Sequence, residues 1–475
     1  MLFNSIDFAV FLPIVFILYW FVVSKNLRLQ NILILISSYI FYGWWDYRFL
    51  SLIVISTIVD YFVGVELAKS HSKTRRKILL WTSIGVNLGI LGFFKYFNFF
   101  LENFNQAFSF LGASIDSPAL NIVLPVGISF YTFQTLSYSI DVYRGKLKPT
   151  RNLLEFASFV AFFPQLVAGP IERATNLLPQ FNKKRKFEYK QAMDGVNQII
   201  WGLFKKVVVA DNCAKMVNEI FANYHDLNGS TLVLGAVLFA FQIYGDFSGY
   251  SDMAIGVSRL FGFNLMQNFA FPYFSRDIAE FWRRWHISLS TWFRDYLYIP
   301  LGGSKGSLKL KVRNTFIIFL VSGFWHGANW TFIVWGALNA LYFLPLLLSS
   351  RNRRHLDNVA SNRLFPSIRE VLSVIGTFVL TTLAWVFFRA KDIHEALAYM
   401  SGIFNKSIFS AIEFENTLLM ATCSVMVIAL VVVEWFNRHK KHALEHRTSI
   451  WPIIVLIFII TIFGGEAQEF IYFDF

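Results

Sequence analysis

Residues 316–335 read FIIFLVSGFWHGANWTFIVW, an apolar run that is interrupted by one histidine, His326. A helix of about 20 residues covers roughly 30 Å, which is the thickness of the hydrocarbon core of a bilayer. An ionisable side chain inside such a run is costly, so it marks a functional site by default. Gly323 and Gly327 flank the histidine and leave room for another group to approach it. Burial favours the neutral imidazole, which can act as a general base toward a hydroxyl group.

The rest of the chain has the composition of an integral membrane protein. Of its 475 residues, 55% are hydrophobic and only 15% are charged, whereas soluble domains carry about 25% charged residues. Apolar blocks that are long enough to span a bilayer lie at 6–23, 30–45, 49–68, 78–101, 371–388, 417–436 and 450–463. We therefore expect an all-α, polytopic membrane protein that forms a single domain over residues 1–475.

The net charge of +13 invites a nucleic-acid partner, but the basic residues lie between the apolar blocks. Cytoplasmic loops of membrane proteins are enriched in Lys and Arg, and anionic lipid headgroups account for these charges more simply. Cys213 and Cys423 are far apart in the sequence, and no group of residues has the spacing of a zinc site. We expect contacts with membrane lipids, no nucleic acid, no disulfide framework and no bound metal.

The basic loops also predict the topology, with both termini outside. Residues 153–170 lie between two basic inner loops and contain two prolines, so we expect a re-entrant or broken segment there. Residues 258–313 are long, basic and only partly apolar, which indicates amphipathic helices at the inner face. Residues 314–348 are expected to form a hairpin or re-entrant pair with His326 near its apex.

A second histidine, His286, lies in FWRRWHISLSTWFRDYLYIP (281–300). On residue chemistry alone, the tryptophans and arginines around it favour a belt at the membrane interface. The alternative is a cluster that receives an acidic acyl donor through Arg283, Arg284 and Arg294. In that case His286 would help to orient the donor.

Two polar stretches interrupt other apolar segments. Asp246 and Asp252 lie in QIYGDFSGYSDMAIG (242–256), where they would form structural ion pairs with nearby arginines or a wall of the site. We favour ion pairing with a supporting role for the site. The polar stripe in residues 124–145, which precede the Pro- and Gly-containing stretch 162–173, either packs helices together or lines a wet tunnel.

Two long motifs, RRWHISLSTWFRDYLYIPLGGS (283–304) and SGFWHGANWTFIVWGALN (322–339), closely resemble the membrane-bound O-acyltransferase family. Within it, the chain is most similar to the membrane subunits of bacterial polysaccharide O-acetyltransferases, such as those that act on alginate. The resemblance covers nearly the whole chain, with core motifs in 124–173 and 242–339. It implies a helical bundle around a central funnel or tunnel, with re-entrant and interfacial helices. It also implies that His326 and His286 are the catalytic histidines.

The resemblance implies acetyl transfer from a cytoplasmic thioester, acetyl-CoA or a compound loaded from it, without a bound cofactor. The acetyl group would reach an exported polysaccharide through an extracytoplasmic partner of the SGNH-hydrolase type. The inward basic loops and the absence of organelle signals favour a bacterial inner membrane. Whether His326 acts as a general base or briefly carries the acetyl group stays open. Further candidate contacts for the substrates are Trp325, Asn329, Asp246, Arg283, Arg284 and Arg294.

Two alternatives remain. One is a D-alanyl or lipid O-acyltransferase of the same fold, because the sequence does not give the width of the tunnel. The other is an acyl-group transporter without chemistry of its own, which intramembrane polar residues and broken helices would also suit. A transporter of that kind is expected to have two matching halves, and the sequence shows no such symmetry.

Overall fold

The computed structural model describes residues 1–110, 120–447, 449–464 and 468–471, and no strand is found among them. Their contacts divide them into two compact units, Met1–Ala192 with Val257–Met266, and Met193–Gly256 with Gln267–Phe475. We describe each unit by itself. The lack of Lys and Arg in residues 102–118 predicts an outer loop, and residues 111–118 of it lie outside the described part of the chain, as does the C-terminus, which is predicted to be on the outer side of the membrane.

Six helical segments of the described chain are long and apolar enough to cross a membrane. They are Leu27–Lys69, Lys73–Ser109, Gly229–Leu260, Trp330–Leu348, Ile368–Arg389 and Thr417–Phe436. Shorter apolar helices, such as Ile6–Val22 and Trp451–Phe463, accompany them. The all-α, polytopic architecture predicted from the apolar blocks is therefore confirmed.

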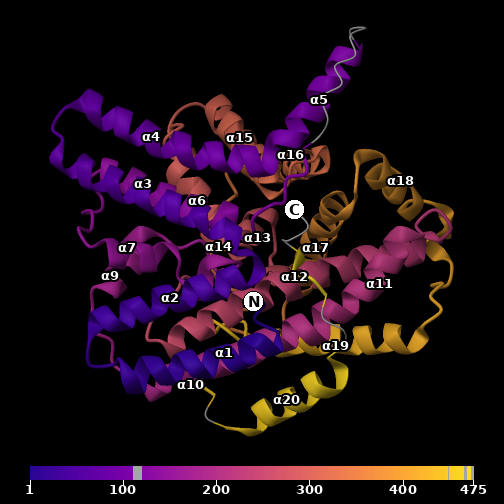
Figure 1. Cartoon of the computed structure of the whole chain (residues 1–475). Coiled ribbons are helices and arrows are strands. Elements are labelled where there is room, and N and C mark those ends of the chain that lie inside the picture. The colour runs from indigo at the N-terminus through magenta and orange to yellow at the C-terminus, as the bar shows by residue number, and fades with distance from the viewer. Residues whose placement is uncertain (111–119, 448, 465–467, 472–475) are drawn as a thin grey trace. The chain divides into compact units, whose positions relative to one another are not determined.

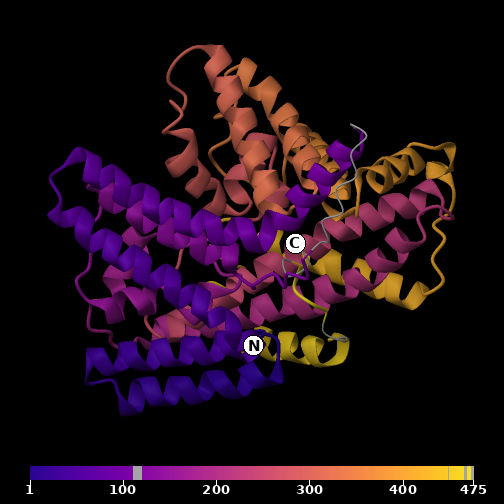
Figure 2. The same ribbon diagram turned by 45° about the horizontal axis from the view of Figure 1, so that its top comes forward.

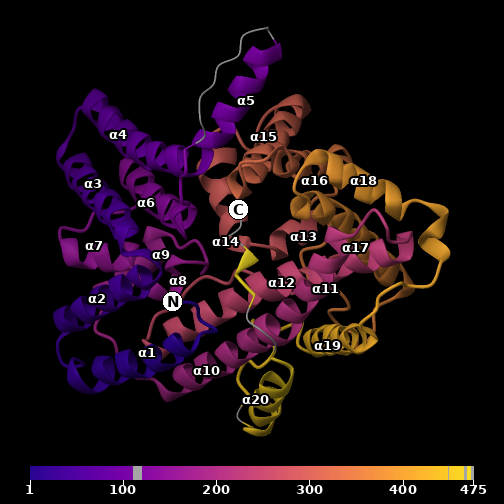
Figure 3. The same ribbon diagram turned by 45° about the vertical axis from the view of Figure 1, so that its right-hand side comes forward.

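The first unit consists of helices only. These are α1 (Ile6–Ile17), α2 (Leu27–Asp46), α3 (Leu50–Lys69), α4 (Lys73–Leu91), α5 (Phe97–Phe110), α6 (Ile128–Tyr143), α7 (Leu153–Val160), α8 (Phe163–Leu166) and α9 (Ala174–Phe181). Figures 1 and 3 show α3, α4 and α6 side by side. The break between α7 and α8 confirms the predicted interruption in residues 153–170, where Pro164 begins a new turn.

Two side chains of the polar stripe in residues 124–145 form hydrogen bonds to other helices. Ser139 of α6 donates to Asp60 of α3 at 2.6 Å, and Asn87 of α4 donates to the same carboxylate at 2.7 Å. Gln134 donates to the carbonyl of Phe159 at 2.7 Å. Polar side chains commonly join transmembrane helices in this way. These contacts favour the packing interpretation of the stripe.

The second unit holds the sequence motifs around both histidines. After α10 (Tyr189–Leu203), its helices are α11 (Asp211–Ala222), α12 (Gly229–Leu260), α13 (Ile278–Arg284), α14 (Ile287–Phe293), α15 (Leu308–His326), α16 (Trp330–Leu348), α17 (Ile368–Arg389), α18 (Ile393–Ile403), α19 (Thr417–Phe436) and α20 (Trp451–Phe463). Helices α15 and α16 form an antiparallel hairpin, drawn in salmon and orange in Figure 2. His326 is the last residue of α15, so the predicted hairpin with the histidine at its turn is confirmed.

Glycines allow the two helices of this hairpin to touch. A Cβ atom on Gly323 would lie 2.2 Å from the carbonyl oxygen of Phe332, and one on Gly327 would lie 2.0 Å from the ring of Phe332. A Cβ atom on Gly336 would likewise lie 2.4 Å from the carbonyl oxygen of Phe319. The group that approaches Gly323 and Gly327 is thus the neighbouring helix.

Two tryptophans of residues 281–300 do not lie where the predicted belt at the membrane interface would place them. Trp285 is 1% exposed, and its ring lies 5.0 Å from the rings of Phe269 and Trp385. Trp292 is also buried. The sequence favours a belt at the membrane interface, but tertiary packing places both indoles in the core of the unit, where their large apolar area is removed from water. The belt interpretation is wrong for these two residues.

Candidate active site

His326 sits in an aromatic enclosure at the turn of the α15–α16 hairpin. Its side chain is buried, and its ring centroid lies 4.9 Å from Trp325, 5.2 Å from Trp335 and 5.3 Å from Phe388. All three rings meet the imidazole edge to face. Edge-to-face contacts of this kind are a preferred geometry for aromatic rings, and they hold the imidazole in an apolar environment.

The structure brings His286 next to His326, although 40 positions separate them in the sequence. Their ring centroids are 6.4 Å apart. His286 is buried just before α14 with a backbone φ of 43°, a left-handed conformation that is uncommon for residues other than glycine. Strained backbone of this kind is concentrated at functional sites. Burial lowers the pKa of His286 to about 3, so its imidazole is neutral at neutral pH.

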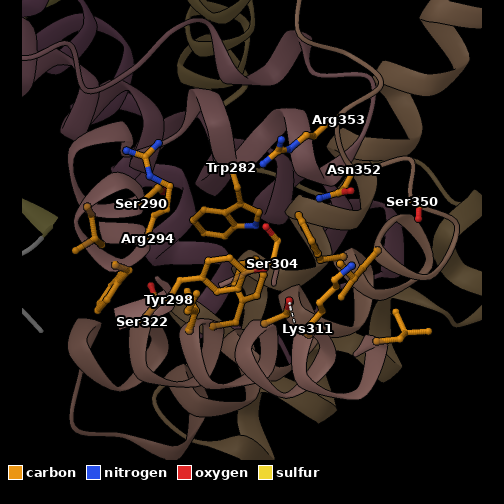
Figure 4. A pocket seen from close by; sticks show the side chains of 18 residues that line it. Trp282, Ser290, Arg294, Tyr298, Ser304, Lys311, Ser322, Ser350, Asn352 and Arg353 are labelled. Atoms are coloured by element: carbon orange, nitrogen blue, oxygen red, sulfur yellow. Dashed lines mark hydrogen bonds between the residues drawn. The ribbon is translucent and has the colours of Figure 1, made fainter. Parts of the chain in front are cut away.

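A cavity of about 500 Å³ lies beside the hairpin. Its basic lining side chains are Arg294, Lys311 and Arg353, and Figure 4 shows them around the indole of Trp282. The other lining residues are mainly apolar or carry hydroxyl groups, and they come from α14, α15, α16 and the neighbouring loops. Cationic side chains next to an apolar chamber suit a ligand with phosphate groups and an acyl chain.

The cavity approaches His326 along α15. Ser322 lines the cavity and precedes His326 by four residues, so the two side chains share a face of the helix about 6 Å apart along its axis. Trp282, also in the lining, packs against Trp335 at 5.6 Å between centroids. Since Trp335 contacts His326, one layer of aromatic side chains joins the cavity to the histidine.

The three predicted donor-binding arginines separate in the structure. Arg294 lines the cavity. Arg283 donates to the carbonyls of Asn352 at 2.9 Å and His355 at 2.6 Å, and Arg284 pairs with Glu280 at 2.8 Å. Arg283 and Arg284 therefore hold the loop after α16 and the α13 helix in place.

Sequence reasoning missed Lys311 and Arg353. They are separated by 42 positions, and each stands in a short basic run that resembles an ordinary inner loop. Only the antiparallel hairpin brings the two ends together at one cavity. A signal was present, because basic residues flank both ends of the hairpin.

The predicted partners of the two aspartates are also corrected. Asp246 pairs with Lys206 at 2.8 Å, and Asp252 pairs with Lys205 at 2.5 Å. Asp246 further accepts the backbone N–H of Ile471 at 2.7 Å. The expected pairing with Arg283, Arg284 or Arg294 is wrong, because the π-helical segment Phe204–Ala210, which follows α10, supplies both lysines. Asp246 thus fastens the described C-terminal residues to this unit.

Two further residues that the sequence predicts to contact the substrates, Trp325 and Asn329, lie close to His326 in the chain. Asn329 caps α16 by accepting the N–H of Thr331 at 3.0 Å, and it donates to the carbonyl of Lys391 at 2.7 Å. Trp325 is buried, and its ring lies 6.1 Å from that of His286 and 4.9 Å from that of His326. Asn329 shapes the turn, and Trp325 contacts the site directly.

The chain is similar to known membrane proteins over most of its length. The sequence model of the membrane-bound O-acyltransferase (MBOAT) family matches residues 146–383. The chain is 39% identical to a probable alginate O-acetylase, AlgI, of Pseudomonas aeruginosa, over 92% of this chain and 81% of that protein. This chain belongs to the MBOAT family.

Other relatives widen the range of acceptors within the family. A peptidoglycan O-acetyltransferase of Helicobacter pylori is 32% identical over 100% of this chain and 98% of its own. A teichoic acid D-alanyltransferase of Bacillus subtilis is 27% identical over 58% of this chain and 71% of its own. The chain is thus a multi-pass membrane O-acyltransferase, an enzyme that takes its acyl group from a donor substrate.

Proposed function

We propose that this MBOAT protein takes an acetyl group from acetyl-CoA at the cytoplasmic face and passes it toward hydroxyl groups of an exported, alginate-like polysaccharide. The observation that carries the proposal is the cavity with basic side chains, whose lining residue Ser322 stands one helical turn before His326 on α15. Figure 4 shows the basic side chains and Ser322 in the cavity wall. The names of the relatives that match most of the chain supply the acetyl group and the polysaccharide acceptor. The membrane is the inner membrane of a bacterium, with both termini outside.

In this mechanism Arg294, Lys311 and Arg353 bind the phosphates of the donor. The thioester extends past Ser322 toward His326. The neutral imidazole of His326 takes the proton of the acceptor hydroxyl while the hydroxyl oxygen attacks the thioester carbonyl carbon. The carbon–sulfur bond then breaks, and the imidazolium returns its proton to the leaving thiolate. No cofactor or net proton is consumed.

A partner completes the pathway in this proposal. The described residues form helices in two compact units, and they include no separate domain that could hold a glycan. We therefore propose an extracytoplasmic protein of the SGNH-hydrolase type, which receives the acetyl group on a hydroxyl and delivers it to the polymer. The match of the family model draws on both units, which supports a single functional domain.

The experiment uses the full chain in lipid vesicles with acetyl-CoA that carries a labelled acetyl group. We expect His326→Ala to remain folded and membrane-inserted but to transfer no label to a hydroxyl acceptor. His394→Ala is the matched control, because it removes an exposed histidine on α18. Normal transfer by His326→Ala would overturn the assignment. Movement of labelled donor across the membrane without covalent transfer would instead indicate a transporter.

The same assay tests a second acyl group, because one set of relatives transfers D-alanine. A donor with a D-alanyl thioester is offered in parallel with acetyl-CoA. Transfer of D-alanine alone would replace acetyl-CoA in the proposal while leaving the role of His326 in place. Covalent label recovered on His326 itself would show that it carries the acyl group and does not act only as a base.

A further inference from the structure

Asn268 lies between α12 and α13, is completely buried and holds the start of α14. Its backbone carbonyl accepts the N–H of Ile287 at 2.8 Å. Its side-chain oxygen Oδ1 lies 3.3 Å from the backbone nitrogen of Ser288, 2.9 Å from the hydroxyl of Ser288 and 3.0 Å from Nδ1 of His286. Its Nδ2 donates to the hydroxyl of Ser251 at 3.0 Å.

The backbone N–H of Ser288 decides which way the carboxamide of Asn268 points. A backbone N–H can only donate, so the atom that faces it must be the amide oxygen. The same oxygen faces Nδ1 of His286, and an oxygen acceptor requires a hydrogen on that nitrogen. In a neutral imidazole with hydrogen on Nδ1, the lone pair lies on Nε2.

Nε2 of His286 is buried and has no hydrogen-bond partner within the part of the chain that the structure describes. Leaving a buried acceptor unpaired is costly, and a catalytic role is one of the reasons for which proteins keep such atoms. The ring centroid also lies 6.4 Å from that of His326, the residue that takes the proton of the acceptor hydroxyl in the proposed function. His286 is therefore arranged to accept a hydrogen bond from a substrate.

We infer that Asn268 is a positioning residue that fixes His286 in the Nδ1–H tautomer, so that Nε2 accepts an O–H or N–H group of a substrate beside His326. The inference rests on the proposed function for the identity of the substrates. The hydrogen that Nε2 accepts differs from the proton that His326 removes. The hydrogen that Nε2 accepts comes from a second hydroxyl group of the acceptor or from an amide N–H of acetyl-CoA.

Three variants separate this role from simple packing. Asn268→Leu keeps the approximate shape of the side chain and removes the oxygen. Asn268→Asp keeps an acceptor toward His286 and Ser288. Ser251→Ala is the matched control, because it removes the partner of Nδ2 and leaves the amide oxygen in place.

The first measurement is the nitrogen NMR spectrum of the full protein in nanodiscs, labelled at the histidine ring nitrogens. The His286 signals are those that disappear in His286→Gln. We expect a protonated Nδ1 and an unprotonated Nε2 in the wild type, in Asn268→Asp and in Ser251→Ala. Asn268→Leu should lose this pattern. A protonated Nε2 in the wild type, or an unchanged tautomer in Asn268→Leu, would overturn the inference.

The second measurement is steady-state transfer of labelled acetyl, with KM determined separately for acetyl-CoA and for the hydroxyl acceptor. Asn268→Leu should lower kcat/KM by roughly 10- to 100-fold, while Asn268→Asp and Ser251→Ala should change it less than about tenfold. A rise in the KM of one substrate identifies which molecule supplies the hydrogen. Equal losses in Asn268→Leu and Ser251→Ala would contradict a positioning role. If the wild type transfers no acetyl group, the proposed function fails, and the NMR result still decides the tautomer.

Discussion

The contact between α15 and α16 supports a prediction that distinguishes two glycines only four residues apart. A Cβ atom on Gly327 would lie 2.0 Å from Cε2 and 2.3 Å from Cδ2 of Phe332. Gly327 has an extended backbone with φ of −160°, so alanine is unstrained there and the Phe332 ring is its obstacle. On Gly323, in contrast, the Cβ atom would lie 2.2 Å from the backbone oxygen of Phe332.

The magnitudes follow from these distances. Carbon atoms in contact normally lie about 3.5 Å apart, so in Gly327→Ala the ring of Phe332 must retreat by roughly 1.5 Å. Phe332 is buried against Phe388, and Phe388 packs on His326. Overpacking of this kind costs about 1–3 kcal/mol of the free energy of unfolding. The displaced ring should also disturb the enclosure of His326 and lower acetyl transfer.

The assay is a double-mutant cycle with Phe332→Ala, read as stability in mixed micelles and as acetyl transfer. Truncating the ring removes the obstacle to Gly327→Ala, so this pair should show a coupling of about 1–3 kcal/mol. Truncation leaves the backbone oxygen in front of Gly323→Ala, so that pair should couple by less than about 0.5 kcal/mol. Gly376→Ala is the control, since no atom lies within 4 Å of its Cβ position. Equal coupling for both glycines would refute the reasoning.

Two more predictions concern charged groups of the second unit. Arg353→Ala should raise KM for acetyl-CoA about three- to tenfold with kcat unchanged, because an exposed charge–phosphate contact contributes roughly 1 kcal/mol to binding. Arg354→Ala is the control, since that side chain does not line the cavity, and a similar rise of KM in this variant would contradict the prediction. Asp246→Leu should lower the thermal denaturation midpoint in detergent more than Asp246→Asn does, because only the asparagine side chain still offers an oxygen to the backbone N–H of Ile471. Equal decreases of the midpoint in the two variants would argue against that contact.

Much of the fold follows from local sequence. Apolar blocks longer than a bilayer core must form helices, because no other open structure satisfies the backbone hydrogen bonds in lipid. The break in residues 153–170 follows from proline, which cannot donate within a helix. The hairpin around His326 follows from two apolar segments with a short Gly- and Asn-containing turn between them. A single histidine in such a hairpin is already conspicuous, because its burial is costly.

The composition of the site depended on tertiary structure. Hydropathy could not place Trp285 in the core, since an indole suits both a membrane interface and a protein interior. It could not choose Lys206 over an arginine as the partner of Asp246, because ion pairs form between groups that packing brings within a few ångströms. The meeting of His286 with His326, the support of His286 by Asn268 and the basic cavity beside them join segments distant in the chain. Local periodicity carries information about neighbours along a helix, whereas these contacts arise only when separate helices pack.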